Sequence, residues 1–295
     1  MTPDSTDTLA LETYRRSIDG TIKYLWSLHD GQTVESVYLP LANRGAKGPS
    51  LCISSQVGCA VRCTFCATGE NGLVRNLTCD EIVAQVETTL DHLGSIPEAF
   101  DVSFMGMGEP LHNLHAVTNA IRKLYANYSG NSDIHFSLST IGITKRIYKL
   151  ADFEHPVALQ VSLHGPTDQI RESLIPERSR GSISDLFNAI RHYAIKRDTM
   201  VNLNYLLFDN LNDTPECAAQ LINLLADKPH VRLKLSHYNP IEGNDLNPAS
   251  SVRKRRFMDL CAQRGLHVFD WESMGVDISG GCGQLRSSSY DDLTA

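Results

Sequence analysis

Short apolar runs recur along the chain from about residue 50 onward, and longer amphipathic segments separate them. Apolar runs of this kind predict buried strands, because both faces of such a strand are covered. Six runs have this character: 101–105, 134–139, 157–163, 201–208, 231–236 and 266–271. The segments between them have apolar residues at helical spacing and predict helices at 80–93, 113–126, 184–196, 215–226 and 251–264.

The segment 80–93 shows the helical pattern most fully. Its apolar residues fall on one face of a helix: Ile82, Val83, Val86 and Leu90. Thr78 is followed three residues later by Glu81, which predicts a capping box at the start of this helix.

Alternating strands and helices predict an α/β fold, with a parallel sheet and helices outside it. About six such units indicate a partial (β/α)6 barrel, in which functional residues gather at the carboxyl ends of the strands. The first 45 residues differ, and we expect a short helix there, followed by a strand pair in TIKYLWSL and TVESVYLP. We therefore divide the chain into a short N-terminal extension (1–45), a barrel (46–286) and a C-terminal tail (287–295).

Composition and charge narrow the class of protein. The 295 residues are 42% hydrophobic and 21% charged, which is ordinary for a globular protein. No apolar run has the length of a membrane span, and the polar start MTPDSTDTLALETYRR lacks a secretory signal, so we expect a cytoplasmic protein. A net charge of −7 argues against a broadly basic nucleic-acid-binding surface but allows a local basic patch.

Three of the eight cysteines lie close together in CISSQVGCAVRCTFCATG, at Cys59, Cys63 and Cys66. In a reducing compartment, clustered cysteines indicate metal binding or catalysis rather than disulfides. A structural zinc site takes four ligands, whereas three thiols on a cubane cluster leave one of its four irons open. The spacing therefore favours a [4Fe–4S] cluster with Phe65 as an apolar shield. Zinc with a distant fourth ligand, or buried structural cysteines, is the alternative.

Polar residues follow several of the predicted strands. In MGMGEP (105–110), Gly106 and Gly108 permit close backbone approach, and Glu109 can accept hydrogen bonds from an ammonium group. Later strand ends carry Ser139, Ser162, His164 and Asn239. Each alone fits an ordinary turn or cap. Together they occupy the edge of the sheet where a parallel barrel binds its ligand.

Cys282 lies in the glycine-rich segment DISGGCGQL (277–285). Its glycine neighbours predict a mobile and accessible loop, where a thiol is reactive rather than structural. The remaining cysteines, Cys79, Cys217 and Cys261, lie in helix-like segments and are predicted to be structural.

These motifs together resemble the RlmN and Cfr family, radical S-adenosylmethionine (SAM) enzymes that methylate adenine carbons in RNA. The resemblance extends over residues 34 to 286 and includes these segments: VESVYLP, CISSQVGCAVRCTFCATG, GLVRNLT, FMGMGEPLHN, LSTIG, SLHGP, IPERSRG, FDNLND, YNPIEG and DISGGCGQL. It implies the incomplete (β/α)6 radical SAM barrel. It also implies one [4Fe–4S] cluster on the cysteine triplet, SAM at its open iron, and an external one-electron donor such as flavodoxin or ferredoxin.

The resemblance implies a role for each site residue. Cys282 receives a methyl group and becomes S-methylcysteine, from which a 5′-deoxyadenosyl radical removes hydrogen. The carbon radical then adds to adenine, Glu35 accepts a proton, and Cys52 resolves the adduct by a transient disulfide with Cys282. The family's SAM contacts correspond to Gly108, Glu109, Ser139, Ser162, Leu163, His164 and Asn239.

The implied substrate is an adenine of ribosomal RNA, with transfer RNA as a further substrate and carbon C2 favoured over C8. The chain departs from the family in its short N-terminal region, in Asp270–Glu272 where a basic stretch is usual, and in Gly280–Gly281 where two alanines are usual. Two alternatives therefore stay open: a diverged radical SAM enzyme that methylates a non-RNA substrate, and a zinc- or cluster-bearing binding protein. Candidate phosphate contacts are Lys145, Arg146, Arg171, Arg178, Arg180 and Arg253–Arg256, although the last run also suits a solvated helix face.

Overall fold

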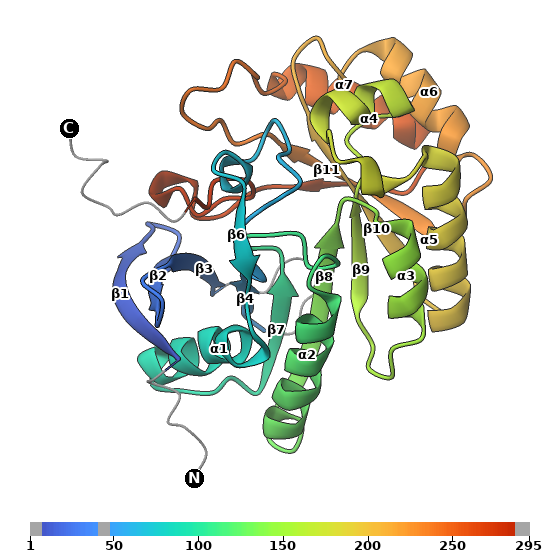
Figure 1. The fold of residues 1–295 in the computed structure, drawn as a ribbon. Helices are drawn as coiled ribbons and strands as arrows, with labels where there is room; N and C mark the ends of the chain where they lie inside the picture. Colours follow the sequence, from blue (N-terminus) through green and yellow to red (C-terminus); the bar gives the residue numbers. More distant parts are fainter. Residues whose placement is uncertain (1–7, 41–47, 287–295) are drawn as a thin grey trace. The chain divides into compact units, whose positions relative to one another are not determined.

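The computed structural model describes residues 8–40 and 48–286. The chain divides into two compact units (Figure 1). Unit 1 comprises Met1–Ala60, Cys66–Phe136 and Met274–Ala295, and unit 2 comprises Val61–Phe65 and Ser137–Ser273. The expected boundary near residue 45 and the expected tail 287–295 lie outside the described residues.

Unit 1 begins with an antiparallel meander of β1 (Leu9–Arg16), β2 (Ile22–Leu28) and β3 (Thr33–Leu39). Strand β3 pairs antiparallel with β4 (Ser50–Ile53), which pairs parallel with β7 (Ala99–Phe104). Helices α1 (Cys79–Leu93) and α2 (Leu114–Tyr128) pack against each other. A small separate sheet joins β5 (Gln56–Gly58) to β6 (Leu73–Asn76).

The helix expected near the start of the chain is wrong, because Leu9–Arg16 forms strand β1. Residues along β1 alternate between more and less exposed positions, which is the period of a strand. Tyr14 lies in register with Tyr24 of β2, with the ring centroids 6.2 Å apart. Pairing along β2 thus overrides the helical propensity of this segment.

The start of α1 confirms the predicted capping box. Thr78 Oγ1 accepts a hydrogen bond from the Glu81 backbone N–H at 3.1 Å, and Glu81 Oε2 accepts one from the Thr78 N–H at 2.8 Å. Both groups satisfy backbone donors that have no partner within the helix. The predicted apolar face is buried: Ile82, Val83, Val86 and Leu90.

Unit 2 contains a parallel sheet in the order β8 (Asp133–Thr140, which begins in unit 1), β9 (Ala158–Ser162), β10 (Val201–Leu207), β11 (Val231–His237) and β12 (Val268–Trp271). Its helices are α3 (Thr144–Ala151), α4 (Asp168–Leu174), α5 (Ile183–Arg197), α6 (Pro215–Leu225) and α7 (Ser251–Gln263). Helices α3 and α5 lie side by side in Figure 1.

The two faces of β10 differ in chemistry. Leu203 and Tyr205 are fully buried on one face, where the Tyr205 ring packs 5.6 Å from Phe257 of α7. Asn202 and Asn204 point to the opposite face and are half-buried. Helices therefore cover the apolar face, and the other face is lined by amides.

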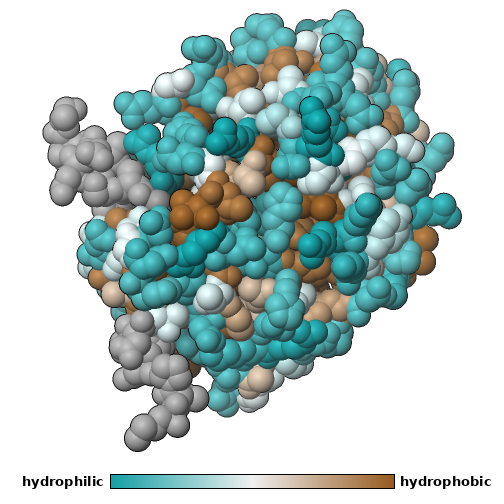
Figure 2. All heavy atoms as spheres, in the orientation of Figure 1, coloured by the Kyte–Doolittle hydropathy of each residue, from teal (hydrophilic) through white to brown (hydrophobic). Residues whose placement is uncertain are grey.

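The six predicted strands correspond to β7–β12, and the five predicted helices to α1, α2, α5, α6 and α7. In the part of the chain that the structure describes, no helix is both long and apolar enough to cross a membrane. The surface seen in Figure 2 is mostly hydrophilic, with apolar residues in small separate groups.

Candidate active site

The cysteine triplet lies on the loop that connects β5 to β6. The Cys59 N–H donates to the Gly72 carbonyl oxygen at 2.9 Å, which fixes the two ends of the loop together. Gly58 has φ +72°, and a Cβ there would lie 2.0 Å from the Gly72 oxygen. Only glycine fits this position. Cys59 and Cys66 belong to unit 1, and Cys63 belongs to unit 2.

The middle of this loop is fixed within unit 2. The Thr64 N–H donates to the Leu174 carbonyl oxygen at the end of α4 at 3.0 Å. The Phe65 ring meets the His164 ring edge-on at 4.8 Å and lies 5.7 Å from the Phe208 ring. Phe65 is therefore a buried apolar anchor next to Cys63 and Cys66.

The donor set of the loop suits a [4Fe–4S] cluster. All eight cysteines lie in the described part of the chain, and none is in a disulfide. Among the described residues, no group of three or more His, Cys, Asp or Glu side chains is placed so that it could hold a metal ion. A cluster binds each thiolate through a different iron, so its ligands do not converge on one point. Three soft thiol donors within eight residues fit that requirement.

The segment MGMGEP lies against the chain that leads into the cysteine loop. The Ser55 N–H donates to the Met107 carbonyl oxygen, and the Glu109 N–H donates to Gln56 Oε1, both at 2.8 Å. Gly108 has φ +99°, and a Cβ there would lie 2.6 Å from the Gln56 Cβ. The Glu109 carboxylate is buried, and its Oε1 accepts from the Leu111 N–H at 2.9 Å. The close approach predicted for the glycines is confirmed.

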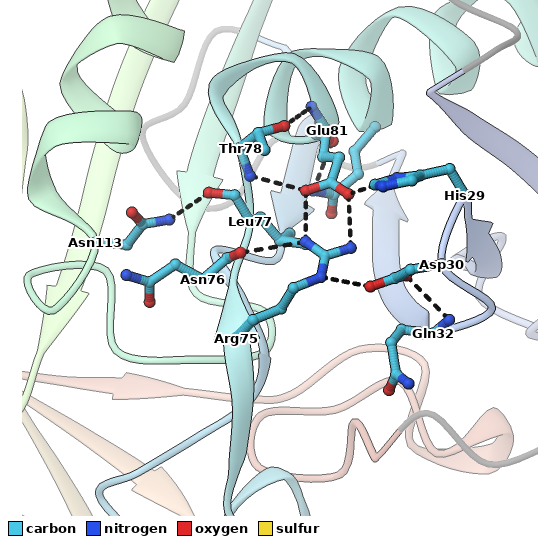
Figure 3. A network of polar contacts seen from close by, with 10 residues as sticks. His29, Asp30, Gln32, Arg75, Asn76, Leu77, Thr78, Glu81 and Asn113 are labelled. Atoms are coloured by element: carbon cyan, nitrogen blue, oxygen red, sulfur yellow. Dashed lines mark hydrogen bonds and ion pairs between the residues drawn. The ribbon is translucent and has the colours of Figure 1, made fainter.

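Arg75 on β6 holds a partly buried polar network that the sequence did not indicate (Figure 3). Its Nη1 and Nη2 lie 2.9 and 2.8 Å from the two carboxylate oxygens of Glu81, and its Nε lies 2.7 Å from Asp30 Oδ2. Burial opposes the charge of Glu81, but hydrogen bonds from Arg75 and Thr78 outweigh burial and lower its pKa. The Arg75 hydrogen bond also lowers the pKa of Asp30 to about 2. The network fastens β6, at the exit of the cysteine loop, to α1 and to the β2–β3 turn.

Glu35, the predicted proton acceptor, is a fully buried residue of β3. Its Oε1 lies 2.9 Å from the ammonium group of Lys23, which is also buried. Its Oε2 accepts a hydrogen bond from the Arg286 N–H at 3.0 Å. The carboxylate thus holds the chain four residues after Cys282.

The Cys282 loop follows the short 3₁₀ helix η4 (Val276–Ile278), and Cys282 is exposed as predicted. The Ala67 N–H donates to the Gly283 carbonyl oxygen at 2.8 Å, and Thr68 Oγ1 donates to the Leu285 carbonyl oxygen at 2.5 Å. Burial raises the pKa of the Cys66 thiol, and the nearby Cys282 adds to this rise. The structure therefore brings Cys282 next to Cys66.

The β1–β2 turn holds the other end of the Cys282 loop. Asp19 Oδ2 accepts from the Gly275 N–H at 2.8 Å, and Ser17 Oγ donates to Asp277 Oδ1 at 2.6 Å. Burial alone would raise the pKa of Asp19, but hydrogen bonds from Gly275, Thr21 and Ser17 lower it to about 2. No local pattern predicts this link, because its partners are more than 250 residues apart.

The other cysteines have distinct surroundings. Cys52 is a half-buried residue of β4, in register with Val37 on one side and Ser103 on the other. Cys217 and Cys261 are buried, in line with a structural role, and burial raises the pKa of Cys261 to about 12. Cys79 is half-buried at the start of α1.

The later predicted SAM contacts gather at the carboxyl ends of strands in unit 2. Ser139 Oγ accepts from Asn204 Nδ2 at 3.3 Å, and Ser162 is in register with the same Asn204. Asn239 Nδ2 donates to Ser273 Oγ at 2.9 Å. Asn204 is not among the predicted contacts, although polar–apolar alternation in VNLNYLLF marks it as a residue of the polar face.

Leu163 and His164 are buried just beyond β9. His164 has φ +51°, and its Nδ1 accepts from the Leu206 N–H at 3.1 Å. Burial lowers the pKa of His164 to about 3, so the ring is neutral near neutral pH. Its ring joins the Phe65 anchor to the end of β10.

Several candidate phosphate contacts prove to be internal. Arg171 has no exposed surface, and Arg180 is buried and bonded to the Ile175 carbonyl oxygen. Lys254 is buried beside Asp270. Arg253 lies 2.6 Å from Asp213. The exposed candidates that remain are Lys145, Arg178, Arg255 and Arg256, with Arg146 half-buried.

Comparison with known proteins fits this arrangement. Residues 53–222 match the Radical SAM superfamily. The Dual-specificity RNA methyltransferase RlmN of Sulfurovum sp. is 35% identical over 95% of this chain and 80% of its own length. Its namesake in Anaeromyxobacter sp. is 39% identical over 95% of this chain and 74% of its own length. The chain belongs to the RlmN family.

A solved structure supports the same assignment for the fold. The radical SAM methyltransferase of Sphaerobacter thermophilus is 36% identical, with a TM-score of 0.86 over 95% of this chain and 82% of its own. The predicted fold class, a partial (β/α)6 radical SAM barrel, is confirmed. The cofactors of this superfamily, a [4Fe–4S] cluster and SAM, suit the donor set of the cysteine loop in this RlmN relative.

Proposed function

We propose that this RlmN family member is a radical SAM RNA methyltransferase that methylates an adenine carbon, C2 in preference to C8. Its substrate is ribosomal RNA, with transfer RNA as a further substrate. The observation that carries the proposal is the position of Cys282, an exposed thiol on a loop hydrogen-bonded to the residues that follow Cys66. A thiol placed there can carry a methyl group beside a cluster ligand.

In this proposal Cys59, Cys63 and Cys66 hold the cluster. Gly108, Glu109, Ser139, Ser162, Leu163, His164 and Asn239 bind SAM. When bound, these cofactors supply a 5′-deoxyadenosyl radical, with the electron provided by a donor such as flavodoxin or ferredoxin. We place this reaction in the cytoplasm, where thiols stay reduced.

The three remaining groups complete the reaction. Cys282 would take a methyl group from one SAM, which leaves as S-adenosylhomocysteine. The 5′-deoxyadenosyl radical would take a hydrogen atom from that methyl group, the carbon would bond to the adenine, and the unpaired electron left on the adduct would return to the cluster. Glu35 takes the proton from the adenine carbon, a role that suits a buried carboxylate fixed by Lys23 at 2.9 Å. Cys52 then attacks the Cys282 sulfur and breaks its bond to the carbon, which takes up a proton, so that a Cys52–Cys282 disulfide forms as the methylated base leaves.

The test is mass spectrometry of a Cys52→Ala variant purified without oxygen and digested with protease and nuclease. We expect a nucleotide on the Cys282 peptide, because the variant cannot resolve the adduct. A Cys79→Ala variant, which loses a thiol outside the proposed site, is the matched control and should carry none. A Cys282 peptide with only a methyl group would favour a non-RNA acceptor, and an unmodified Cys282 would contradict the mechanism.

A further inference from the structure

Arg171 of α4 is a buried positive charge, and among the described residues no carboxylate lies within ion-pair distance of it. It has no exposed surface. Its guanidinium donates to three backbone carbonyl oxygens: Ile141 at 2.8 Å, Leu163 at 3.1 Å and Ser162 at 3.3 Å. Asp168, a nearby carboxylate, lies 3.7 Å from Arg180 instead. A charge removed from water is costly unless an opposite charge compensates it.

One nitrogen of this guanidinium also lacks an acceptor. Nη1 is buried, and no described residue accepts its hydrogen bonds. Burial, together with the nearby charge of Arg180, lowers the pKa of Arg171 to about 10, so the group remains protonated at neutral pH. A buried donor without an acceptor indicates a partner that the protein chain itself does not supply.

Cys63 is a nearby residue whose thiolate would be stabilised by the positive charge of Arg171. The next residue, Thr64, donates its N–H to the Leu174 carbonyl oxygen at 3.0 Å, one helical turn after Arg171. The charges of Asp168 and of a Cys63 thiolate both raise the pKa of Arg171, and Asp168 has the larger effect. A thiolate at Cys63 would therefore face a positive group that has a spare donor.

We propose that Arg171 is a positioning residue for the cluster, with its buried guanidinium facing the Cys63 thiolate as its counter-charge. This inference rests on the proposed cluster at Cys59, Cys63 and Cys66. Arg171 also fixes the carbonyl groups at the ends of β8 and β9, so the same side chain joins the cluster ligand to two strand ends. Because a reduced cluster is more negative, a nearby positive charge raises its reduction potential.

The test compares reduction potentials of anaerobically reconstituted protein without SAM, followed by electron paramagnetic resonance during a redox titration. Arg171→Gln and Arg171→Met remove the charge, and both should give a lower potential than the wild type. Arg171→Lys keeps the charge and should restore the potential largely. Arg178→Met is the matched control, because it removes an exposed arginine nearby and should leave the potential unchanged. Circular dichroism verifies folding, and Gln retains an amide donor for the carbonyl groups if Met does not fold.

Three results would overturn the inference. The first is a wild-type potential in a folded Arg171→Gln or Arg171→Met variant with full iron content. The second is an Arg171→Lys potential as low as that of the neutral variants. The third is weaker SAM binding without a change in potential, which would assign the guanidinium to the SAM carboxylate. Wild-type protein that binds no cluster would overturn this inference and the proposed function together, whereas a cluster-bearing protein that methylates no RNA would overturn only the latter.

Discussion

Thr68 Oγ1 donates a hydrogen bond of 2.5 Å to the carbonyl oxygen of Leu285. The residue two positions after Cys66 thereby holds the residue three positions after Cys282, although 217 residues separate the partners in sequence. The position of Cys282 relative to the cysteine loop therefore depends on contacts that single substitutions can remove.

Replacing Thr68 with Val should loosen the Cys282 loop. The variant keeps the shape of the side chain but leaves the Leu285 oxygen without its donor, at a cost of about 1 kcal/mol. We expect faster amide hydrogen exchange in residues 281–286 and less S-methylation of Cys282, measured by mass spectrometry. Thr118→Val is the control, because Thr118 Oγ1 bonds within α2 to Leu114 at 2.9 Å. Equal exchange in both variants would contradict this role for Thr68.

Asp19→Asn should weaken the link between the β1–β2 turn and the Cys282 loop. The folded-state pKa of Asp19 is about 2, below its ordinary value of 3.8. The ionised carboxylate therefore stabilises the fold at pH values above 3.8. This contribution is lost as the pH falls through about 4 to about 2, and solvent screening limits it to about 1 kcal/mol.

The measurement for Asp19 is urea unfolding at pH 7 and at acid pH. The variant should lose stability at pH 7, and the difference from the wild type should shrink towards pH 2, where the wild-type carboxylate is protonated. Asp259→Asn, a change of an exposed residue on α7, serves as the control for net charge. A pH-independent difference for Asp19→Asn would contradict the assignment to its carboxylate.

Arg75→Met should destabilise unit 1 by about 2–3 kcal/mol, because it leaves the buried carboxylate of Glu81 without its main partner. The double variant Arg75→Met with Glu81→Gln removes the uncompensated charge and should recover part of the loss. Urea denaturation measures both. A double variant less stable than the sum of the two single changes would show that Glu81 is stabilised by other groups.

Gly108→Ala tests the turn that precedes Glu109. Its φ of +99° and the 2.6 Å approach to the Gln56 Cβ make any side chain strained, so we expect a loss of about 2 kcal/mol or more and weaker SAM binding. Gly130→Ala is the control, because a Cβ there has no neighbour within 4 Å. Thermal unfolding and equilibrium SAM binding would measure the two effects. A Gly108→Ala variant as stable as Gly130→Ala would disprove the steric requirement.

Periodicity predicted most of the regular structure, because burial repeats locally along a strand or helix. Strands β7–β12 and the capping box at Thr78 follow from residues close in sequence. Strand β1 was mistaken for a helix because its conformation depends on pairing with β2. Short elements such as β4 and α4 are too brief for a clear period.

The site likewise combines features that local sequence patterns predict with features that depend on contacts between distant residues. Motif spacing identified Cys59, Cys63 and Cys66 as a group, and glycine neighbours indicated that Cys282 is accessible. Arg171 was expected on the surface, since an arginine in a polar segment gives no sign of burial. The pairs Lys23–Glu35 and Thr68–Leu285 are set by strand pairing and by loop packing, which composition does not encode.

The turn at Ser17–Asp19 ties strands β1 and β2 to the segment that leads to Cys282. A deletion that removes this turn would release the segment around Cys282 while leaving every parallel strand of the described residues encoded. Insertions and deletions in this turn are thus constrained by the position of Cys282. An affinity tag fused close to this turn would meet the same constraint, so a tag placed elsewhere is the safer choice for purification.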